Sequence, residues 1–152
     1  MILTSEKAES EALLNAAKLM VVAARTAPKA MGDDKIKAAV VTGAEKEELA
    51  NTMEQMGKTR DSKSVRDSGA VVLLGVEFGT PTEDWINFRG KLIDLGIALG
   101  SAVKVAGALN VDNRIMRSVG LAAMKMGLFK ADEIQGIPLS IKGKNIFFDR
   151  KT

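Results

Sequence analysis

The sequence predicts an α+β fold, with helices layered on a sheet, and a single domain spanning residues 1–152. Apolar residues recur at helical spacing in several segments, while other segments are short apolar runs typical of strands. The expected order is α-β-α-α-β, an irregular loop, then α-α-β-β. This order lacks strict βαβ alternation and therefore favours an α+β sandwich over a doubly wound parallel sheet. No internal repeat, linker or low-complexity tract divides the chain.

The first half of the chain is expected to contain three helices and two strands. Ser5 can cap the first helix, which should end near Arg25–Ala27 because Pro28 disfavours a helical conformation in the residue before it. Ile36–Thr42 is rich in β-branched residues and predicts a strand. The remaining segments are Glu45–Met56 (a helix closed by Gly57), Asp61–Asp67 (a short helix capped by Asp61) and Ala70–Val76 (a strand). The last is continuously apolar, as is typical of a central strand covered on both faces.

The second half begins with an irregular segment, Glu77–Gly90, that contains the chain's one tryptophan. A long helix, Lys91–Leu109, is expected next. Asp112 is then expected to cap a second helix, which Gly127 closes. The final prediction is a hairpin whose strands are Ile137–Ile141 and Asn145–Asp149.

Composition excludes several kinds of chemistry. The chain contains no cysteine and no histidine, so it lacks the usual nucleophile, the usual near-neutral base and the ligands of zinc and iron–sulfur sites. Its net charge of +3 is spread along the chain, which disfavours a nucleic-acid partner. The N-terminus lacks a signal-peptide pattern, and the longest uncharged stretches are too short for a membrane span. A cytoplasmic protein without a membrane partner is expected.

Two glycines mark the long helix as a surface for close approach. Gly96 and Gly100 lie four residues apart, so one face of the helix lacks side chains. Close helix–helix or helix–sheet packing is the favoured explanation on physical grounds, and approach of a flat ligand is the alternative. Asp94, on the same helix, needs a partner if it is buried, either Arg89 or Lys91 or the polar edge of a ligand.

The loop after the first helix carries two cations and a hydroxyl group. Arg25, Thr26 and Lys29 could hold a phosphate together with backbone NH groups. The simpler alternative is that a cation at the helix C-terminus interacts with the negative end of its own helix dipole, and the residues alone favour this alternative.

Four segments together resemble a known family. They are Ala23–Lys29, Ile93–Val103, Asn110–Met116, and Gly136–Ser140 with Gly143–Arg150. They resemble, in order and nearly end to end, the ferredoxin domain-containing proteins of archaea and anaerobic bacteria. Members of that family usually carry a cysteine-rich loop before the Ile-Asp-Leu-Gly helix, and the loop is thought to bind an iron–sulfur cluster. The corresponding loop here, Phe78–Gly90, is short and has no cysteine, so no cluster is expected.

The same segments have a more distant similarity to the flavin nitroreductase fold, which implies a reduced form of that α+β sandwich. Nitroreductases are typically homodimers that bind FMN at the subunit interface. By analogy, Arg25, Thr26 and Lys29 would approach the phosphate, and Gly96, Gly100 and Ser101 would lie against the interface or the flavin. Lys142 and Lys144 would supply further cations. The candidate cofactor-binding residues are therefore Arg25, Thr26, Pro28, Lys29, Asp94, Gly96, Gly100, Ser101, Lys142 and Lys144.

Two hypotheses about function follow. The leading one is a flavin-binding redox protein, a possible FMN-dependent oxidoreductase without an iron–sulfur cluster, acting as a homodimer on a small molecule that the sequence does not identify. In that case the chemistry would come from the cofactor, because no catalytic residues are evident in the chain. The rival is a non-catalytic binding or assembly protein that retains the fold without the cofactor, which the lack of acid–base groups favours.

Overall fold

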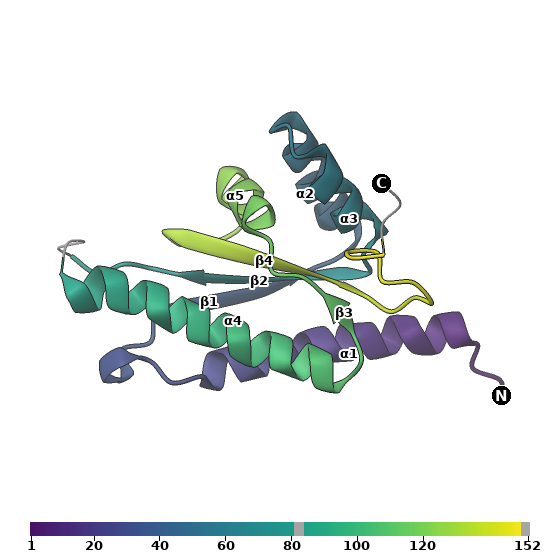
Figure 1. Cartoon of the computed structure of the whole chain (residues 1–152), viewed down its shortest axis with the longest axis horizontal. Coiled ribbons are helices and arrows are strands. Elements are labelled where there is room, and N and C mark those ends of the chain that lie inside the picture. Colours follow the sequence, from purple (N-terminus) through teal and green to yellow (C-terminus); the bar gives the residue numbers. More distant parts are fainter. Residues whose placement is uncertain (81–83, 150–152) are drawn as a thin grey trace.

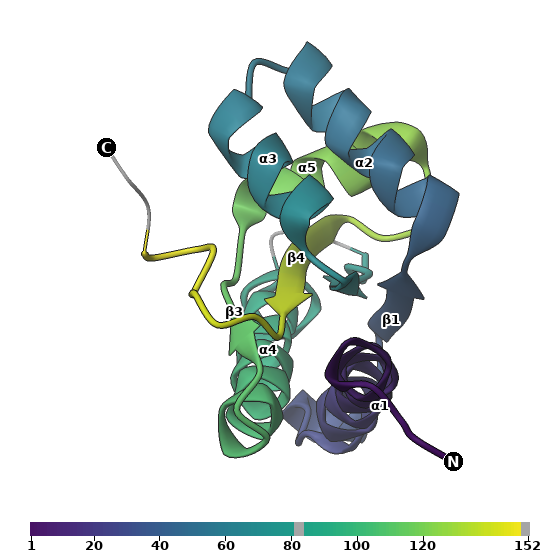
Figure 2. The same cartoon turned by 90° about the vertical axis from the view of Figure 1, so that its right-hand side faces the viewer.

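A computed structural model describes residues 1–80 and 84–149 as a four-stranded sheet with helices on both faces (Figures 1 and 2). The strand order is β1-β2-β4-β3, and every pair is antiparallel. The strands are β1 (Ile36–Val41), β2 (Ala70–Val76), β3 (Asp112–Asn113) and β4 (Glu133–Ser140). The mixture of helices and an antiparallel sheet confirms the predicted α+β class.

Strand β2 lies at the centre and is buried along its whole length, as its continuous apolar run predicts. Its side chains alternate between two cores, because successive residues of a strand point to opposite faces. Val72 and Leu74 belong to one hydrophobic cluster, whereas Val71 and Leu73 belong to the other.

Two long helices cover one face of the sheet. Helix α1 (Ser5–Thr26) and helix α4 (Lys91–Ala108) pack against each other and run in opposite directions (Figure 1). Helix α1 buries a stripe of small and apolar side chains that repeats at helical spacing. The stripe is Leu13, Ala16, Ala17, Met20 and Ala24. A single 3₁₀ turn, η1 (Ala30–Gly32), follows α1 in the connection to β1.

Three shorter helices cover the opposite face: α2 (Gly43–Gln55), α3 (Thr59–Asp67) and α5 (Arg117–Met126) (Figure 2). Helix α5 lies very close to β4. The approach is so close that a Cβ atom at Gly120 would overlap the backbone carbonyl oxygen of Ile134. A Cβ atom at Gly136 of β4 would likewise overlap the side chain of Val119. These two glycines permit the contact between the helix layer and the sheet.

Several predicted boundaries are confirmed. Helix α1 ends at Thr26, two residues before Pro28. Gly57 and Gly127 follow α2 and α5 with φ angles of 75° and 64°, the left-handed conformation that glycine adopts readily after a helix. The cap of α1 is Thr4, whose hydroxyl accepts a bond from the backbone NH of Lys7, and not Ser5 as expected.

Two predictions in the C-terminal third are wrong. Asp112 does not cap a helix: it lies in the short edge strand β3, paired with Ser140, and α5 begins only at Arg117. The expected hairpin is absent from the described residues, because β4 pairs with β2 and β3, and residues 145–149 form turns.

The boundaries of two further segments differ from expectation. Helix α3 begins at Thr59, so Asp61 lies within its first turn and does not cap it. Part of the expected loop is a π-helical turn, η2 (Trp85–Gly90), which runs directly into α4, while residues 81–83 of the loop lie outside the described residues. None of the described helices is both long enough and apolar enough to cross a membrane.

Candidate functional site

The structure brings part of the predicted site together in a groove between α1 and α4. We call it the α1–α4 groove. It has a volume of about 410 Å³ and is lined by Ala23, Thr26, Ala27, Pro28, Ser101, Lys104, Val105 and Ala108. Three predicted residues, Thr26, Pro28 and Ser101, therefore share one concave surface although they come from distant parts of the chain. Most of the remaining lining is small and apolar.

Two lining residues have unused polar groups. Neither the Ser101 hydroxyl nor the Lys104 ammonium has a hydrogen-bond or ion-pair partner among the described residues. Thr26 differs, because its hydroxyl donates to the backbone carbonyl of Val22 at 3.0 Å. Ser101 and Lys104 are thus the donors that the groove can offer to a ligand.

Arg25 does not line the groove. Its two terminal nitrogens make a bidentate interaction with the two oxygens of the Asp34 carboxylate, at 2.9 and 2.5 Å. One of these nitrogens also donates to the carbonyl of Ile36. Arg25 therefore joins the end of α1 to the start of β1. The nearby guanidinium also lowers the pKa of Asp34 below its ordinary value, with a smaller contribution from the Ile36 NH, while slight burial acts in the opposite direction.

Lys29 is also engaged within the loop. Its ammonium donates to the carbonyls of Arg25 and Ala27, at 2.5 and 2.8 Å, and so caps the C-terminal end of α1. The alternative in which a cation satisfies the helix end therefore holds for Lys29. In Arg25 the guanidinium instead pairs mainly with a carboxylate.

A buried ion pair anchors this loop to α4. Lys91 is fully buried, and its ammonium lies 3.0 Å from the Asp33 carboxylate, 2.7 Å from the Asp33 carbonyl and 3.6 Å from Asp94. Asp94 is 2% exposed, and its Oδ1 accepts a bond of 2.9 Å from the backbone NH of Ala30. Its Oδ2 has no hydrogen bond among the described residues. Of the two partners predicted for Asp94, Lys91 is thus the observed one.

The glycine face of α4 is open. Apart from its two chain neighbours and the adjacent helix backbone, no described atom would lie within 4 Å of a Cβ atom placed at Gly96 or Gly100. The described residues therefore provide no close helix–helix or helix–sheet contact at these glycines, contrary to the favoured expectation. Ile93 and Ile97 flank them and are 52% and 40% exposed. This face remains accessible to a second molecule.

Lys142 and Lys144 lie away from the groove. Lys142 donates to the carbonyl of Asp67 at the end of α3, and Lys144 lines a cavity beside α3. Because α3 covers the opposite face of the sheet, the chain does not bring these two lysines to the other candidate residues. Sequence reasoning also missed two residues, Lys104 in the groove and Asp33 in the anchor, because no local pattern distinguishes them from solvated charges.

The donor set does not fit an iron–sulfur cluster. The chain has no cysteine and no histidine, and the described residues contain no group of three acidic side chains placed to hold a metal ion.

Comparison with known proteins identifies the family. A family described as "Uncharacterized protein containing a ferredoxin domain (DUF2148)" matches residues 88–150. An "Uncharacterized protein" from Archaeoglobus fulgidus is 39% identical over 180 residues, covering 99% of this chain and 98% of the relative. The chain belongs to this family. This member lacks the cysteines that the word ferredoxin suggests.

Solved structures show that this member of the family has a nitroreductase-like fold. The hypothetical oxidoreductase YcnD from Bacillus subtilis matches 86% of this chain with a TM-score of 0.69 and 16% identity. NfrA2 from B. megaterium matches 95% with a TM-score of 0.67 and 11% identity. This chain spans only 58% and 61% of the length of those two proteins. A putative nitroreductase from Desulfovibrio desulfuricans, solved in complex with FMN, matches 95% of this chain and 78% of its own, with a TM-score of 0.66 and 14% identity.

Proposed function

We propose that this protein is an FMN-binding redox protein of nitroreductase-like type, in which the α1–α4 groove forms part of the flavin site. The observation that carries the proposal is the joining of Thr26, Pro28 and Ser101 in one groove, beside the open glycine face of α4. The fold adds support, because a putative nitroreductase of similar fold is described in complex with FMN.

The residues of the groove fit the parts of a flavin mononucleotide. A phosphate or ribityl chain needs hydrogen-bond donors, which Ser101 and Lys104 offer. A flat ring needs an apolar surface without bulky side chains, which Ala27, Pro28 and Val105 offer. The volume of about 410 Å³ lies within the range of small-ligand sites. Bound FMN would supply the electron and hydride chemistry that the chain's own side chains lack.

The residues around the groove would act as its support. Arg25 and Lys29 hold the end of α1, and the Lys91–Asp94 pair holds the following loop against α4. In this proposal these hydrogen bonds hold the segment that contains Pro28 next to α4, which carries Ser101. In this proposal Arg25, Lys29 and Asp94 position the site and do not contact the phosphate.

A second copy of the chain would complete the site. The glycine face of α4 and its flanking Ile93 and Ile97 form an apolar surface that the described residues leave uncovered. Burial of such a surface in a homodimer would remove apolar area from water. Light scattering should give the mass of two chains. Ile97→Glu should yield single chains. Ile115→Glu is the control: its side chain is equally exposed (41%), but it lies outside α4, between β3 and α5, and this variant should remain a dimer.

Flavin binding can be tested directly. The purified protein should retain or take up FMN, measured by its visible absorption and by quenching of flavin fluorescence on titration. Lys104→Gln and Ser101→Ala should each weaken binding by about tenfold. Lys125→Gln, which removes the same charge from α5 on the opposite face, is the control. If the wild-type protein does not bind FMN at micromolar concentrations, the proposal fails.

A non-catalytic binding or assembly protein is the alternative. The internal bonds of Arg25 and Lys29 favour it, because they engage the cations that the sequence offered to a phosphate. Under this alternative the dimerisation test gives the same result, but neither FMN binding nor its loss in Lys104→Gln is observed.

A further inference from the structure

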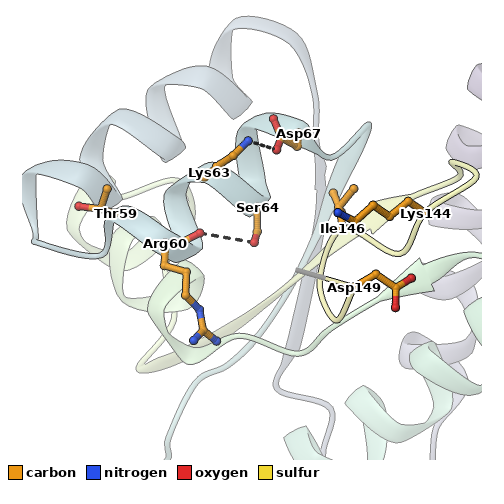
Figure 3. Close-up of a pocket in the computed structure, with 8 residues that line it drawn as sticks. All are labelled: Thr59, Arg60, Lys63, Ser64, Asp67, Lys144, Ile146 and Asp149. Atoms are coloured by element: carbon orange, nitrogen blue, oxygen red, sulfur yellow. Dashed lines mark hydrogen bonds and ion pairs between the residues drawn. The ribbon is translucent and has the colours of Figure 1, made fainter. Parts of the chain in front are cut away.

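We propose that a second cavity, between α3 and the segment of residues 142–149, binds the phosphate group of a small organic molecule. We call it the α3 cavity. It has a volume of about 540 Å³. It is lined by Thr59, Arg60, Lys63, Ser64 and Asp67 of α3 and by Lys144, Ile146 and Asp149 of the facing segment (Figure 3).

The α3 wall is one face of a helix. Its five lining residues recur at intervals of three or four positions, so they lie above one another on the helix surface. The opposite face of α3 is fixed in the core, where Val65 is fully buried and the Ser62 hydroxyl donates to the carbonyl of Ala50 at 2.8 Å. The polar wall therefore belongs to a helix whose position is set by packing.

The facing wall is also held in place. Phe147 is 1% exposed and belongs to the hydrophobic cluster under α3. The Asn145 side chain accepts bonds from the backbone NH groups of Phe147 and Phe148, at 3.0 and 3.2 Å. Lys142 bonds the end of α3 at the Asp67 carbonyl, at 2.8 Å. The cavity is therefore formed by two walls with defined contacts.

The charges of the cavity leave two cations without a close counter-ion. The Asp67 carboxylate is paired with Lys63 at 2.5 Å, and Asp149 accepts a bond from the backbone NH of Asn145. The nearest carboxylate oxygen to Arg60 is that of Asp61, at 4.0 Å, and Arg60 is 70% exposed. Lys144 has no carboxylate within 4.0 Å among the described residues. It extends from its segment toward α3 (Figure 3).

This arrangement suits a phosphate attached to an apolar group. A phosphate carries up to two negative charges and three acceptor oxygens, which suit the Lys144 ammonium facing α3. The Arg60 guanidinium points away from Lys144 in Figure 3, so in this proposal the exposed Arg60 side chain turns toward the phosphate when it binds. The Thr59 hydroxyl offers a further donor, and Ile146 offers an apolar wall for the rest of the ligand. The volume is sufficient for a ligand of mononucleotide size. The α3 cavity lies on the opposite face of the sheet from the α1–α4 groove, so this inference is independent of the proposed flavin site.

AMP is a suitable probe, with adenosine as its uncharged counterpart. Titration of the full chain at low ionic strength, followed by calorimetry, should show binding of AMP, competition by inorganic phosphate and much weaker binding of adenosine. Failure of AMP to bind, or equal binding of adenosine, would overturn the proposal.

Charge-neutralising variants locate the site. Arg60→Gln and Lys144→Gln should each weaken AMP binding by about tenfold. Lys130→Gln makes the same change in net charge at a side chain that is 94% exposed on the loop before β4, and it should leave AMP binding unchanged. An equal loss in all three variants would mean that only net charge matters, and the site would be rejected. Thermal unfolding of each variant checks that the fold is intact.

The two proposed sites can be separated with the same proteins. The double variant Arg60→Gln/Lys144→Gln should lose AMP binding and keep FMN binding, whereas Lys104→Gln should do the reverse. If FMN binding falls in the α3-cavity variant, the flavin phosphate occupies that cavity and the separate site is rejected.

Discussion

The open glycine face of α4 makes an unusual prediction: Gly100→Ala should stabilise the dilute protein. Glycine in a helix interior is about 0.8–1.0 kcal/mol less favourable than alanine. The added methyl group would contact no described atom beyond the helix backbone within 4 Å, and Gly100 does not have a positive φ angle. The full propensity gain should therefore appear, as an increase of about 1 kcal/mol in the free energy of unfolding.

Gly120→Ala is the matched contrast, because it is the same substitution in a helix that packs closely. Its methyl group would overlap the carbonyl oxygen of Ile134 in β4, and backbone cannot move aside as a flexible side chain can. Overpacking of this kind typically costs about 1–3 kcal/mol, occasionally more, which should exceed the propensity gain. The two alanine variants should therefore shift stability in opposite directions.

Urea unfolding and thermal unfolding, both followed by far-ultraviolet circular dichroism, measure the two effects. At protein concentrations where light scattering gives the mass of one chain, Gly100→Ala should raise the melting temperature by about 2–4 °C. At concentrations where wild-type chains associate, the same variant should associate more weakly, because the methyl group separates the two surfaces. A loss of stability in the dilute Gly100→Ala protein would refute the reasoning, since it would mean that the chain packs on this face itself.

Two further predictions concern charged groups near the groove. Lys91→Met should lower the free energy of unfolding by about 3–5 kcal/mol, because it leaves Asp94 buried without its cation. The double variant Lys91→Met/Asp94→Leu should lower it less. A double-mutant cycle measured by urea unfolding would detect this non-additivity. The pKa of Asp34 is lowered in the folded state, so this carboxylate contributes stability that is present above about pH 4 and is lost as the pH falls through its folded-state pKa. Arg25→Gln should therefore flatten this part of the curve of unfolding free energy against pH.

The sequence predicts the elements whose signals are local. The apolar run of β2 needs no knowledge of its neighbours, and the end of α1 is set by Pro28 two residues away. The α5 terminus at Gly127 is likewise a local conformational requirement. Elements that depend on distant pairing were missed. Asp112 looks like a helix cap, but it joins the sheet through Ser140, which lies 28 positions later.

The candidate site follows the same rule. The sequence shows that Arg25 is a cation in a loop, but not that Asp34 returns to meet it. It shows that Gly96 and Gly100 lack side chains, but not that the rest of the described chain leaves them uncovered. The sequence indicates Lys91 only as a possible partner for Asp94, because its contact with Asp33 joins residues 58 positions apart. In each case the residue type is visible in the sequence, and its role depends on a long-range contact.

The buried Lys91–Asp94 pair links the fold to the proposed function. A buried ion pair is an inefficient source of stability, since apolar residues of similar volume often stabilise a core equally well or better. What it provides is a fixed geometry: Lys91 binds Asp33 and Asp94 binds the Ala30 NH, so the loop after Pro28 has one position on α4. Pro28, at the start of this loop, and Ser101 of α4 both line the α1–α4 groove, so we expect the anchor to influence the spacing of its two walls. A chain that needed only stability would not require this arrangement, whereas a chain that holds a ligand in the groove would.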